Sequence, residues 1–146
     1  MTDATSVEIV RTIAAPVAKV FAAWTDAAIL RLWLAPSPCV VLEASADARP
    51  GGRYRIVVVD GEGDQHVTSG EYREVVPEKR LVKTWVYEGK HSPGPYRTLL
   101  TVEFRGTGPR STELALRQEP LLTAEDRARN TDGWRLCLDN LDALLR

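Results

Sequence analysis

Apolar and polar residues alternate in the first patterned segment of the chain, residues 7–13. Val7, Ile9 and Ile13 fall on one face of an extended chain, and Glu8 falls on the other. A period of two is the repeat of a β-strand that buries one face. The pattern therefore predicts a strand near the start of the sequence.

Two short helices are predicted next. Pro16 suits the first turn of a helix, where its missing N–H would have no partner anyway, and apolar residues follow at helical spacing as far as Trp24. In the segment TDAAILRLWLAP, Thr25 or Asp26 is placed to cap a second helix, and Pro36 ends the periodic pattern. A pair of helices is thus expected between the first strand and the rest of the chain.

Residues 39–120 predict six more strands. Their apolar residues alternate with polar ones or are β-branched, and turn-forming segments such as GEGD (61–64) and GKHSPGP (89–95) separate them. Short connections join antiparallel neighbours, whereas parallel strands require long crossovers. We therefore expect an antiparallel meander.

The stretch RPGGRYRIVVVD (49–60) places two glycines between arginines, a composition that also occurs in phosphate-binding loops. Such loops present backbone N–H groups at the N-terminus of a helix, in spacings such as GxGxxG or GxxxxGK[ST]. Neither spacing occurs here, and a run of Val and Ile typical of a strand follows Gly52. Gly51 and Gly52 are therefore predicted to turn the chain into a strand.

The C-terminal segment has the pattern of one long amphipathic helix. Thr123 is placed to cap it, and apolar residues recur from Trp134 to Leu145 at the spacing of a single helical face. A wide apolar stripe must pack on another apolar surface. Among the predicted elements, the concave face of the sheet is the surface that is large enough. The sequence thus predicts an α+β fold, in which a curved antiparallel sheet of about seven strands wraps around the C-terminal helix.

This order of elements resembles the helix-grip fold of the START-like (SRPBCC) superfamily. Within it, the chain resembles the branch that contains the C-terminal domain of the activator of Hsp90 ATPase. Five segments in series carry the resemblance: RTIAAPVAKVFAAWTD, RPGGRYRI, GEYREVVPEKRLVKTW, STELALRQ and DGWRLCLDNLDALL. They cover almost the whole chain, so residues 1–146 are interpreted as one such domain. One departure is Asn130, which stands where many relatives carry a histidine, three positions before the Gly133–Trp134 pair.

The resemblance implies a cavity between the sheet and the long helix, but fold alone does not fix function. Members of the superfamily bind lipids, hormones or polyketides, and some catalyse cyclisation or related chemistry. The leading hypothesis is a module that binds a small hydrophobic or aromatic ligand in this cavity. One alternative is an enzyme of the cyclase or dehydratase type that uses a buried acid. Another is a protein that contacts a chaperone of the Hsp90 type.

Candidate ligand contacts follow from strand alternation and from the apolar stripe of the last helix. For the strand that contains Trp85 and Tyr87, two orientations are open. These two residues line the cavity if their face is concave, and Val82, Thr84 and Val86 line it otherwise. Apolar walls with a few hydroxyl groups suit a small hydrophobic ligand. The candidate pocket residues are Trp33, Tyr54, Ile56, Tyr72, Trp85, Tyr87, Leu100, Val102, Trp134 and Leu138.

Catalytic residues are not assigned from the sequence. Glu71, Glu74 and Glu103 fall in predicted strands, where each is either an acid inside the cavity or, more commonly, a residue of the solvent face. His66 and His91 are expected in loops or at strand edges, so no nucleophile–base–acid group is proposed. Without HxxxH or CxxC spacing, neither a metal nor another cofactor is expected.

Charge and composition exclude some classes of binding partner. The 19 basic and 20 acidic residues nearly cancel, which gives no electrostatic basis for binding nucleic acid. No signal peptide is visible and no apolar run approaches the roughly 20 residues of a membrane span, so a cytoplasmic protein without membrane insertion is expected. Cys39 and Cys137 are expected to be buried thiols. Edge strands of a meander allow pairing with a second copy, so a homodimer is a further expectation.

Overall fold

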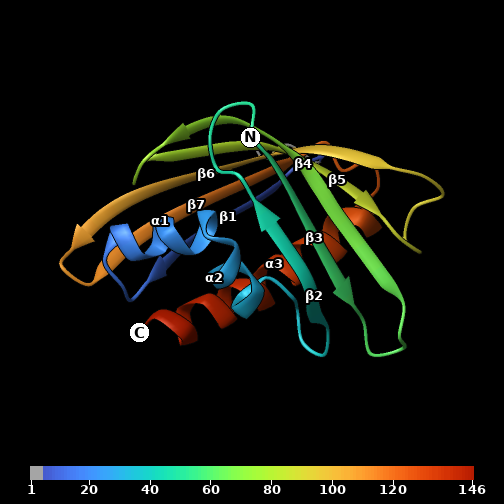
Figure 1. Ribbon diagram of the computed structural model, residues 1–146, viewed down its shortest axis with the longest axis horizontal. Helices are drawn as coiled ribbons and strands as arrows, with labels where there is room; N and C mark the ends of the chain where they lie inside the picture. The colour runs from blue at the N-terminus through green and yellow to red at the C-terminus, as the bar shows by residue number, and fades with distance from the viewer. Residues whose placement is uncertain (1–4) are drawn as a thin grey trace.

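The structure, a computed structural model, describes residues 5–146 and has the order of elements that the sequence predicts (Figure 1). One strand, two short helices, six strands and one long helix follow one another. Their bounds are β1 (Val7–Ile13), α1 (Val17–Thr25), α2 (Ala27–Trp33), β2 (Val40–Ala46), β3 (Arg53–Val59), β4 (Gln65–Val76), β5 (Arg80–Glu88), β6 (Tyr96–Gly108), β7 (Ser111–Glu119) and α3 (Ala124–Leu145).

The strands form one open antiparallel sheet in the order β1-β7-β6-β5-β4-β3-β2. All neighbours except β1 and β7 are consecutive in the sequence, as expected for a meander. The sheet is curved, and α3 runs across its concave side with α1 and α2 beside it (Figure 1). The predicted α+β helix-grip fold is therefore confirmed. Strands β1 and β2 form the two edges of the sheet, and an edge strand can pair with a second copy of the chain. The homodimer stays a prediction.

Side-chain caps set where two of the helices begin. The Thr123 hydroxyl accepts a hydrogen bond from the backbone N–H of Asp126 at 3.0 Å and so caps α3. The Asp26 carboxylate accepts one from the N–H of Ala28 at 2.9 Å and caps α2. Both caps were predicted, and the structure selects Asp26 over Thr25.

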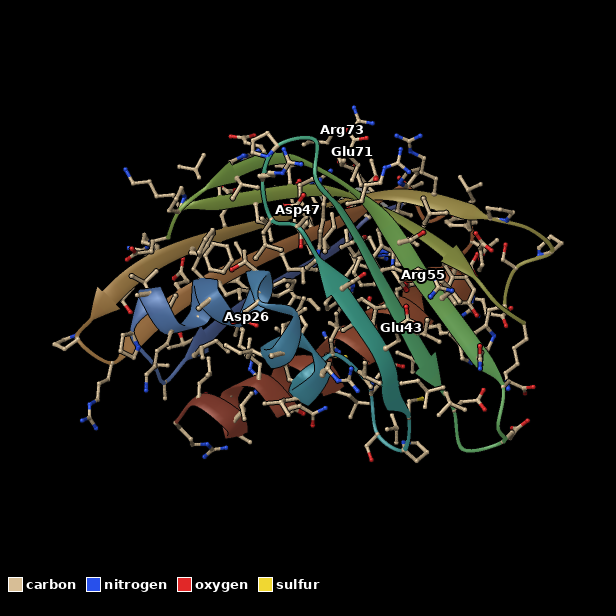
Figure 2. All side chains as sticks on the ribbon, in the orientation of Figure 1. Asp26, Glu43, Asp47, Arg55, Glu71 and Arg73 are labelled. Carbon is tan, nitrogen blue, oxygen red and sulfur yellow. The ribbon has the colours of Figure 1, made fainter. Side chains whose placement is uncertain are left out.

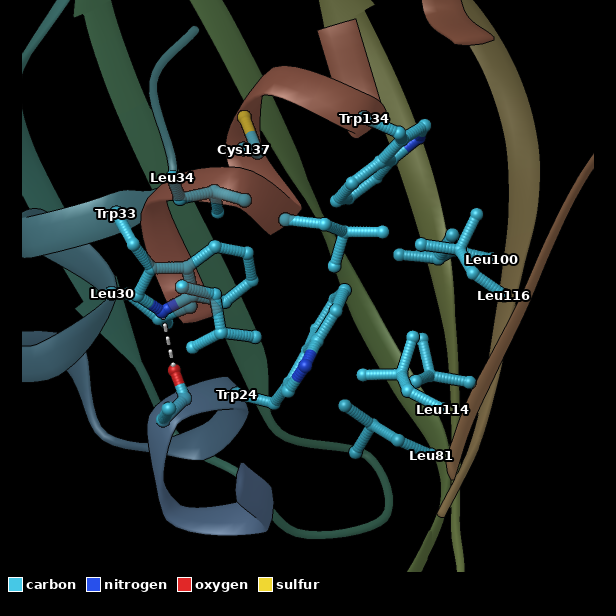
Figure 3. Packing of buried hydrophobic residues seen from close by; sticks show 14 of the residues in the cluster. Trp24, Leu30, Trp33, Leu34, Leu81, Leu100, Leu114, Leu116, Trp134 and Cys137 are labelled. Carbon is cyan, nitrogen blue, oxygen red and sulfur yellow. Dashed lines mark hydrogen bonds between the residues drawn. The ribbon is translucent and has the colours of Figure 1, made fainter. Parts of the chain in front are cut away.

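Three tryptophans join the helices above the sheet (Figure 3). The ring of Trp24 in α1 lies 4.8 Å from that of Trp33 in α2 and 5.7 Å from that of Trp134 in α3, measured between centroids. The indole N–H of Trp33 donates to the carbonyl oxygen of Ala23 at 3.0 Å. Buried aromatic pairs contribute about 0.5–1.5 kcal/mol beyond the area that they bury. The cluster therefore fixes α3 against the two short helices.

The glycine pair at residues 51 and 52 makes a turn, as predicted. Gly51 adopts φ +84°, and a Cβ on Gly52 would lie 1.9 Å from the carbonyl oxygen of Asp47. The N–H of Gly51 donates to Tyr72 O, and the N–H of Tyr72 donates to Gly52 O, both at 2.8 Å. Strand β3 follows, not a helix. The N–H groups of Gly51 and Tyr72 are used in hydrogen bonds between backbone segments, so the turn is not a phosphate-binding loop.

The strand glutamates that were considered as buried acids lie on the outer side of the sheet. Arg80 pairs with Glu74 at 3.2 Å and with Glu103 at 3.4 Å, and the two carboxylates are 46% and 60% exposed. Figure 2 shows Glu71 and Arg73 pointing away from α3. The possibility that one of these acids lies inside a cavity was therefore wrong, because the pleat turns each of them outward.

A pocket between the long helix and the sheet

A pocket of about 510 Å³ lies between α3 and the concave face of the sheet. Side chains from β3 to β7 form one wall and side chains from α3 form the other. The segment that follows α2, the β3–β4 turn, the β5–β6 loop and the β7–α3 connection supply the remainder. Volumes of about 300–1,000 Å³ are usual for small-molecule sites. The dimensions therefore suit a ligand of modest size.

Two indoles dominate the apolar part of the pocket. The centroids of Trp85 on β5 and Trp134 on α3 lie 5.1 Å apart, with Ile56, Leu34 and Leu121 also on the wall. Trp85 is only partly buried, whereas Trp134 is 4% exposed. The two rings together offer an aromatic surface to any molecule that enters.

A chain of buried polar groups fixes the orientation of Trp134. Its indole N–H donates to the amide oxygen of Gln118 at 2.8 Å, and the amide nitrogen of Gln118 donates to Thr98 Oγ1 at 2.9 Å. The Thr98 hydroxyl donates in turn to the carbonyl oxygen of Trp85 at 3.2 Å. A buried glutamine costs free energy unless its amide is hydrogen-bonded. This chain meets that requirement and connects the two aromatic walls.

A second chain of polar groups lies on the pocket wall and joins three titratable residues. His66 Nε2 lies 2.8 Å from Asp60 Oδ2, and His66 Nδ1 lies 2.6 Å from the Tyr87 hydroxyl oxygen. The side chains of Asp60 and His66 are only 13% and 14% exposed. Antiparallel register places His66 on β4 close to Tyr87 on β5, because Thr68 is the direct partner of Tyr87.

Asp60 is held as a carboxylate by donors on both of its oxygens. Oδ1 accepts the backbone N–H groups of Glu62 and Asp64 at 2.9 and 3.0 Å, and Oδ2 accepts from His66 and from Lys90 Nζ at 3.0 Å. The hydrogen bonds from His66 and Lys90 hold the pKa of Asp60 well below its usual range. The hydrogen bonds that Lys90 donates to Asp60 and Asp64 raise the pKa of Lys90.

The surroundings of Tyr87 keep its phenol protonated. Burial raises the pKa of Tyr87 above that of a free tyrosine. Burial, followed by the positive charge of Arg129, lowers the pKa of His91, whose ring stacks on His66 with centroids 5.4 Å apart. At neutral pH the wall therefore carries a neutral phenol, a neutral His91 and an ionised Asp60.

The two cysteines also face the pocket, and both are free thiols. Cys137 is buried as expected, whereas Cys39 is partly exposed. Burial raises the pKa of Cys137 to about 12 and also raises the pKa of Cys39. Both therefore stay protonated near neutral pH and act as small apolar groups, not as nucleophiles.

Lys83 lies in the core next to the pocket residue Trp85. Its side chain is 1% exposed, and Nζ finds no hydrogen-bond partner among residues 5–146. Four aromatic rings surround this nitrogen, those of Trp24, Tyr54, Tyr72 and Trp85, with centroids 4.3–5.9 Å away. Burial lowers the pKa of Lys83 to about 7.

The predicted pocket residues divide into two groups. Ile56, Trp85, Tyr87 and Trp134 line the pocket, so the face of β5 that carries Trp85 is the concave one. The other six are fully or nearly fully buried in the core and do not line the pocket: Trp33, Tyr54, Tyr72, Leu100, Val102 and Leu138. Whether any of the ten binds a ligand stays a prediction.

Sequence reasoning missed the polar residues of the pocket. His66 lies two positions before Thr68 and so shares its face of β4. This alternation is a sequence signal that places His66 on the same side as Thr68. Asp60 gave no signal, because the hairpin turn folds it back onto His66. Gly133 faces open space, since a Cβ there would meet no atom within 4 Å.

Two general features limit the kinds of site that the described residues offer. Within residues 5–146, no three His, Cys, Asp or Glu side chains are grouped so that they would hold a metal ion. No helix in the same range is long and apolar enough to cross a membrane.

Several solved structures share this fold along nearly their whole length. Protein CV1439 from Chromobacterium violaceum is 28% identical, with a TM-score of 0.82 over 97% of this chain and 96% of that one. A protein from Rhizobium leguminosarum is also 28% identical, with a TM-score of 0.79 over 96% and 93%. The AHSA1 (SPO3351) protein from Silicibacter pomeroyi is 25% identical, with a TM-score of 0.83 over 96% of each chain.

No curated protein matches the sequence. A family does match, over residues 14–146, and it is described as activator of Hsp90 ATPase homolog 1-like protein. This match includes α1, α2, the six strands of the meander and α3, which are the elements that build the pocket. Together with the helix-grip fold, it shows that the chain belongs to the activator of Hsp90 ATPase homolog 1-like family of the START-like superfamily.

Proposed function

We propose that the chain binds a small apolar or aromatic molecule in the pocket between α3 and the sheet. The observation that carries this proposal is the pairing of Trp85 and Trp134 on a pocket of about 510 Å³. Aromatic rings bury a large area with little loss of conformational freedom, so they favour flat apolar ligands. The pocket is specific support for ligand binding, whereas chaperone contact rests on the family alone.

The polar groups indicate how such a molecule is oriented. Gln118 and Thr98 are satisfied by each other and by the two tryptophans, so they shape the pocket between the aromatic walls. Tyr87 and His66 form a separate polar region of the pocket wall. We therefore expect the apolar body to lie against the indoles and a single polar group to lie near Tyr87.

A fluorescence titration tests the proposal. The probe is 8-anilinonaphthalene-1-sulfonate, an aromatic fluorophore, and native mass spectrometry of protein purified from its host reports any retained molecule. Gly133 faces the open pocket, so Gly133→Leu is expected to fill it and weaken probe binding at least tenfold, while Gly133→Ala binds within about threefold. Equal binding to all three proteins, or no binding at all, would overturn the proposal.

A further inference from the structure

We propose that Asp60, His66 and Tyr87 form a proton-transfer relay that ends in the pocket. The ligand class that fits this relay is an apolar carbonyl compound with an acidic α-hydrogen, whose keto and enol forms the relay interconverts. The inference rests on the proposed function, because the relay acts only on a molecule held beside Tyr87.

The tautomer of His66 follows from the saturation of Asp60. A carboxylate that accepts four hydrogen bonds has no proton to give, so His66 Nε2 must donate to it. In a neutral imidazole the other nitrogen then carries a lone pair. His66 Nδ1 therefore accepts the hydrogen bond from Tyr87, at 2.6 Å. This is the arrangement of an acid, a base and a hydroxyl group found in nucleophile-activating triads.

The oxygen of Tyr87 retains the capacity to accept a proton from a ligand. Its own hydrogen points at His66, and the backbone N–H of His91 donates to it over a long 3.4 Å. A phenol oxygen both donates and accepts, and the long contact from His91 is weak, so a stronger donor in the pocket can take its place at the acceptor side of Tyr87. Because Tyr87 lines that pocket, a ligand reaches the relay through this oxygen.

Gly89 is the second feature that points to the relay. A Cβ at this position would lie 2.3 Å from the Tyr87 hydroxyl oxygen and 3.1 Å from His66 Nδ1. Any larger residue would therefore push the phenol away from the imidazole. The loop leaves room at the one point where the proton passes between the two side chains.

The chemical step balances without a co-reactant. Tyr87 accepts the α-proton of the bound carbonyl compound as its own proton moves to His66 Nδ1. This leaves a ligand enolate and an imidazolium that the Asp60 carboxylate stabilises. The return path delivers a proton from His66 through Tyr87 to the enolate oxygen, which gives the enol and restores the protein. The reverse sequence converts enol to ketone.

Charged side chains of both signs surround the relay. Lys90 contacts Asp60, and the positive charge of Arg129 on α3 acts on both Tyr87 and His91. The acids nearby, Asp64 and Asp126, pair with Lys90 and Arg129 respectively. Glu62 also pairs with Lys90. The imidazolium of the relay is therefore the cation that balances a developing enolate next to Tyr87.

The test uses phenylacetone, a neutral aryl ketone, with the purified protein in deuterated buffer. Proton NMR follows the replacement of α-hydrogen by deuterium, and quenching of tryptophan fluorescence reports binding separately. Exchange is expected to exceed the buffer rate, and Tyr87→Phe is expected to lower it about 100-fold or more, the usual contribution of general acid–base catalysis. Binding to Tyr87→Phe is expected to change less than about threefold.

Two glycine variants separate the relay from general effects on the loop. Gly89→Ala is expected to abolish exchange because its methyl group displaces the Tyr87 hydroxyl. Gly94→Ala, in the same loop, places its methyl group in open space and is expected to exchange at the wild-type rate. Equal exchange rates in the two variants would overturn the relay.

His66 and Asp60 are positioning residues, so their variants need a readout beyond loss of rate. Asp60→Asn is expected to lower the exchange rate and to change the nitrogen NMR spectrum of His66, because the imidazole loses the acceptor that fixes its tautomer. Nitrogen NMR of His66 is expected to show a protonated Nε2 and a bare Nδ1 in the wild-type protein without ligand. Binding of phenylacetone without exchange overturns the relay alone, whereas absence of binding counts against the proposed function and its substrate class together.

Discussion

The ammonium nitrogen of Lys83 lies 4.3 Å from the centre of the Tyr54 ring, in the interior of the protein. Tyr54 itself donates its hydroxyl to the carbonyl oxygen of Thr84 at 2.6 Å, and burial raises its pKa. Ring faces attract a cation, but they replace only part of the hydration that an ammonium loses on burial. Lys83 is therefore a destabilising residue held in place by good packing.

Replacing Lys83 with methionine is expected to stabilise the fold. Methionine has a similar length and carries no charge, so it keeps the packing and removes the desolvation penalty. Exchanging buried charges for apolar residues of similar volume changes stability by about 0 to +4 kcal/mol in other proteins. We expect a gain of about 1–4 kcal/mol at pH 6, measured by urea unfolding. A loss of stability at this pH would show that the amine has a polar partner.

The same residue predicts a dependence of stability on pH. Its pKa is lowered from 10.5 to about 7 in the fold, so between these values the unfolded chain binds a proton that the folded chain does not. Stability therefore rises with pH across this window. At about 1.4 kcal/mol per pKa unit, the full shift corresponds to an upper limit of roughly 5 kcal/mol.

The measurement is the difference in unfolding free energy between Lys83→Met and the wild-type protein, from pH 6 to pH 10. The advantage of the variant is expected to be constant below about pH 7 and to shrink as the pH rises further. Using the difference cancels the other titrating groups that the two proteins share. An advantage that stays flat up to pH 10 would contradict a lowered pKa at Lys83.

Gly133→Ala is expected to raise stability. Glycine within a helix costs about 1 kcal/mol relative to alanine, and a Cβ at this position meets no atom within 4 Å. A gain of about 0.5–1 kcal/mol is expected from thermal or urea unfolding. No gain would indicate that the backbone of α3 at this point is not free to accept a side chain.

Gly70→Ala is expected to have the opposite effect. A Cβ on Gly70 would lie 2.1 Å from the carbonyl oxygen of Thr84, the same oxygen that accepts the hydroxyl of Tyr54. The clash involves backbone on both sides and is not relieved by a change of rotamer. We expect a loss on the order of 3 kcal/mol, in the range of severe single substitutions. The control is Gly94→Ala, which is expected to unfold like the wild-type protein.

The fold could be predicted almost completely, because every element is encoded by a local pattern. The alternation around Ile9, the helical spacing that leads to Trp24 and the apolar stripe that begins at Trp134 each specify one element. The family resemblance then supplied their arrangement. Burial of one face is a property of the sequence in each segment, so it can be read without knowledge of the rest.

The polar part of the site could be predicted only in fragments. Asp60, His66 and Tyr87 come from a turn and two strands, and their contacts depend on the register between β4 and β5. That register is set by a bulge near Tyr72, which sequence alternation alone does not locate. Alternation also cannot separate Trp85, on the pocket wall, from its neighbour Lys83 in the closed core, since both share one face of β5.

The pairing of β1 with β7 sets the order in which the molecule can be completed. Val7 lies opposite Gln118, so β1 has no partner in the sheet until β7 has been synthesised. The hairpins from β2 to β6 involve neighbours in sequence and are free to form earlier. Trp85 then stays exposed until Trp134 arrives on the last helix. A nascent chain thus completes the contact between Trp85 and Trp134 only after α3 has been synthesised.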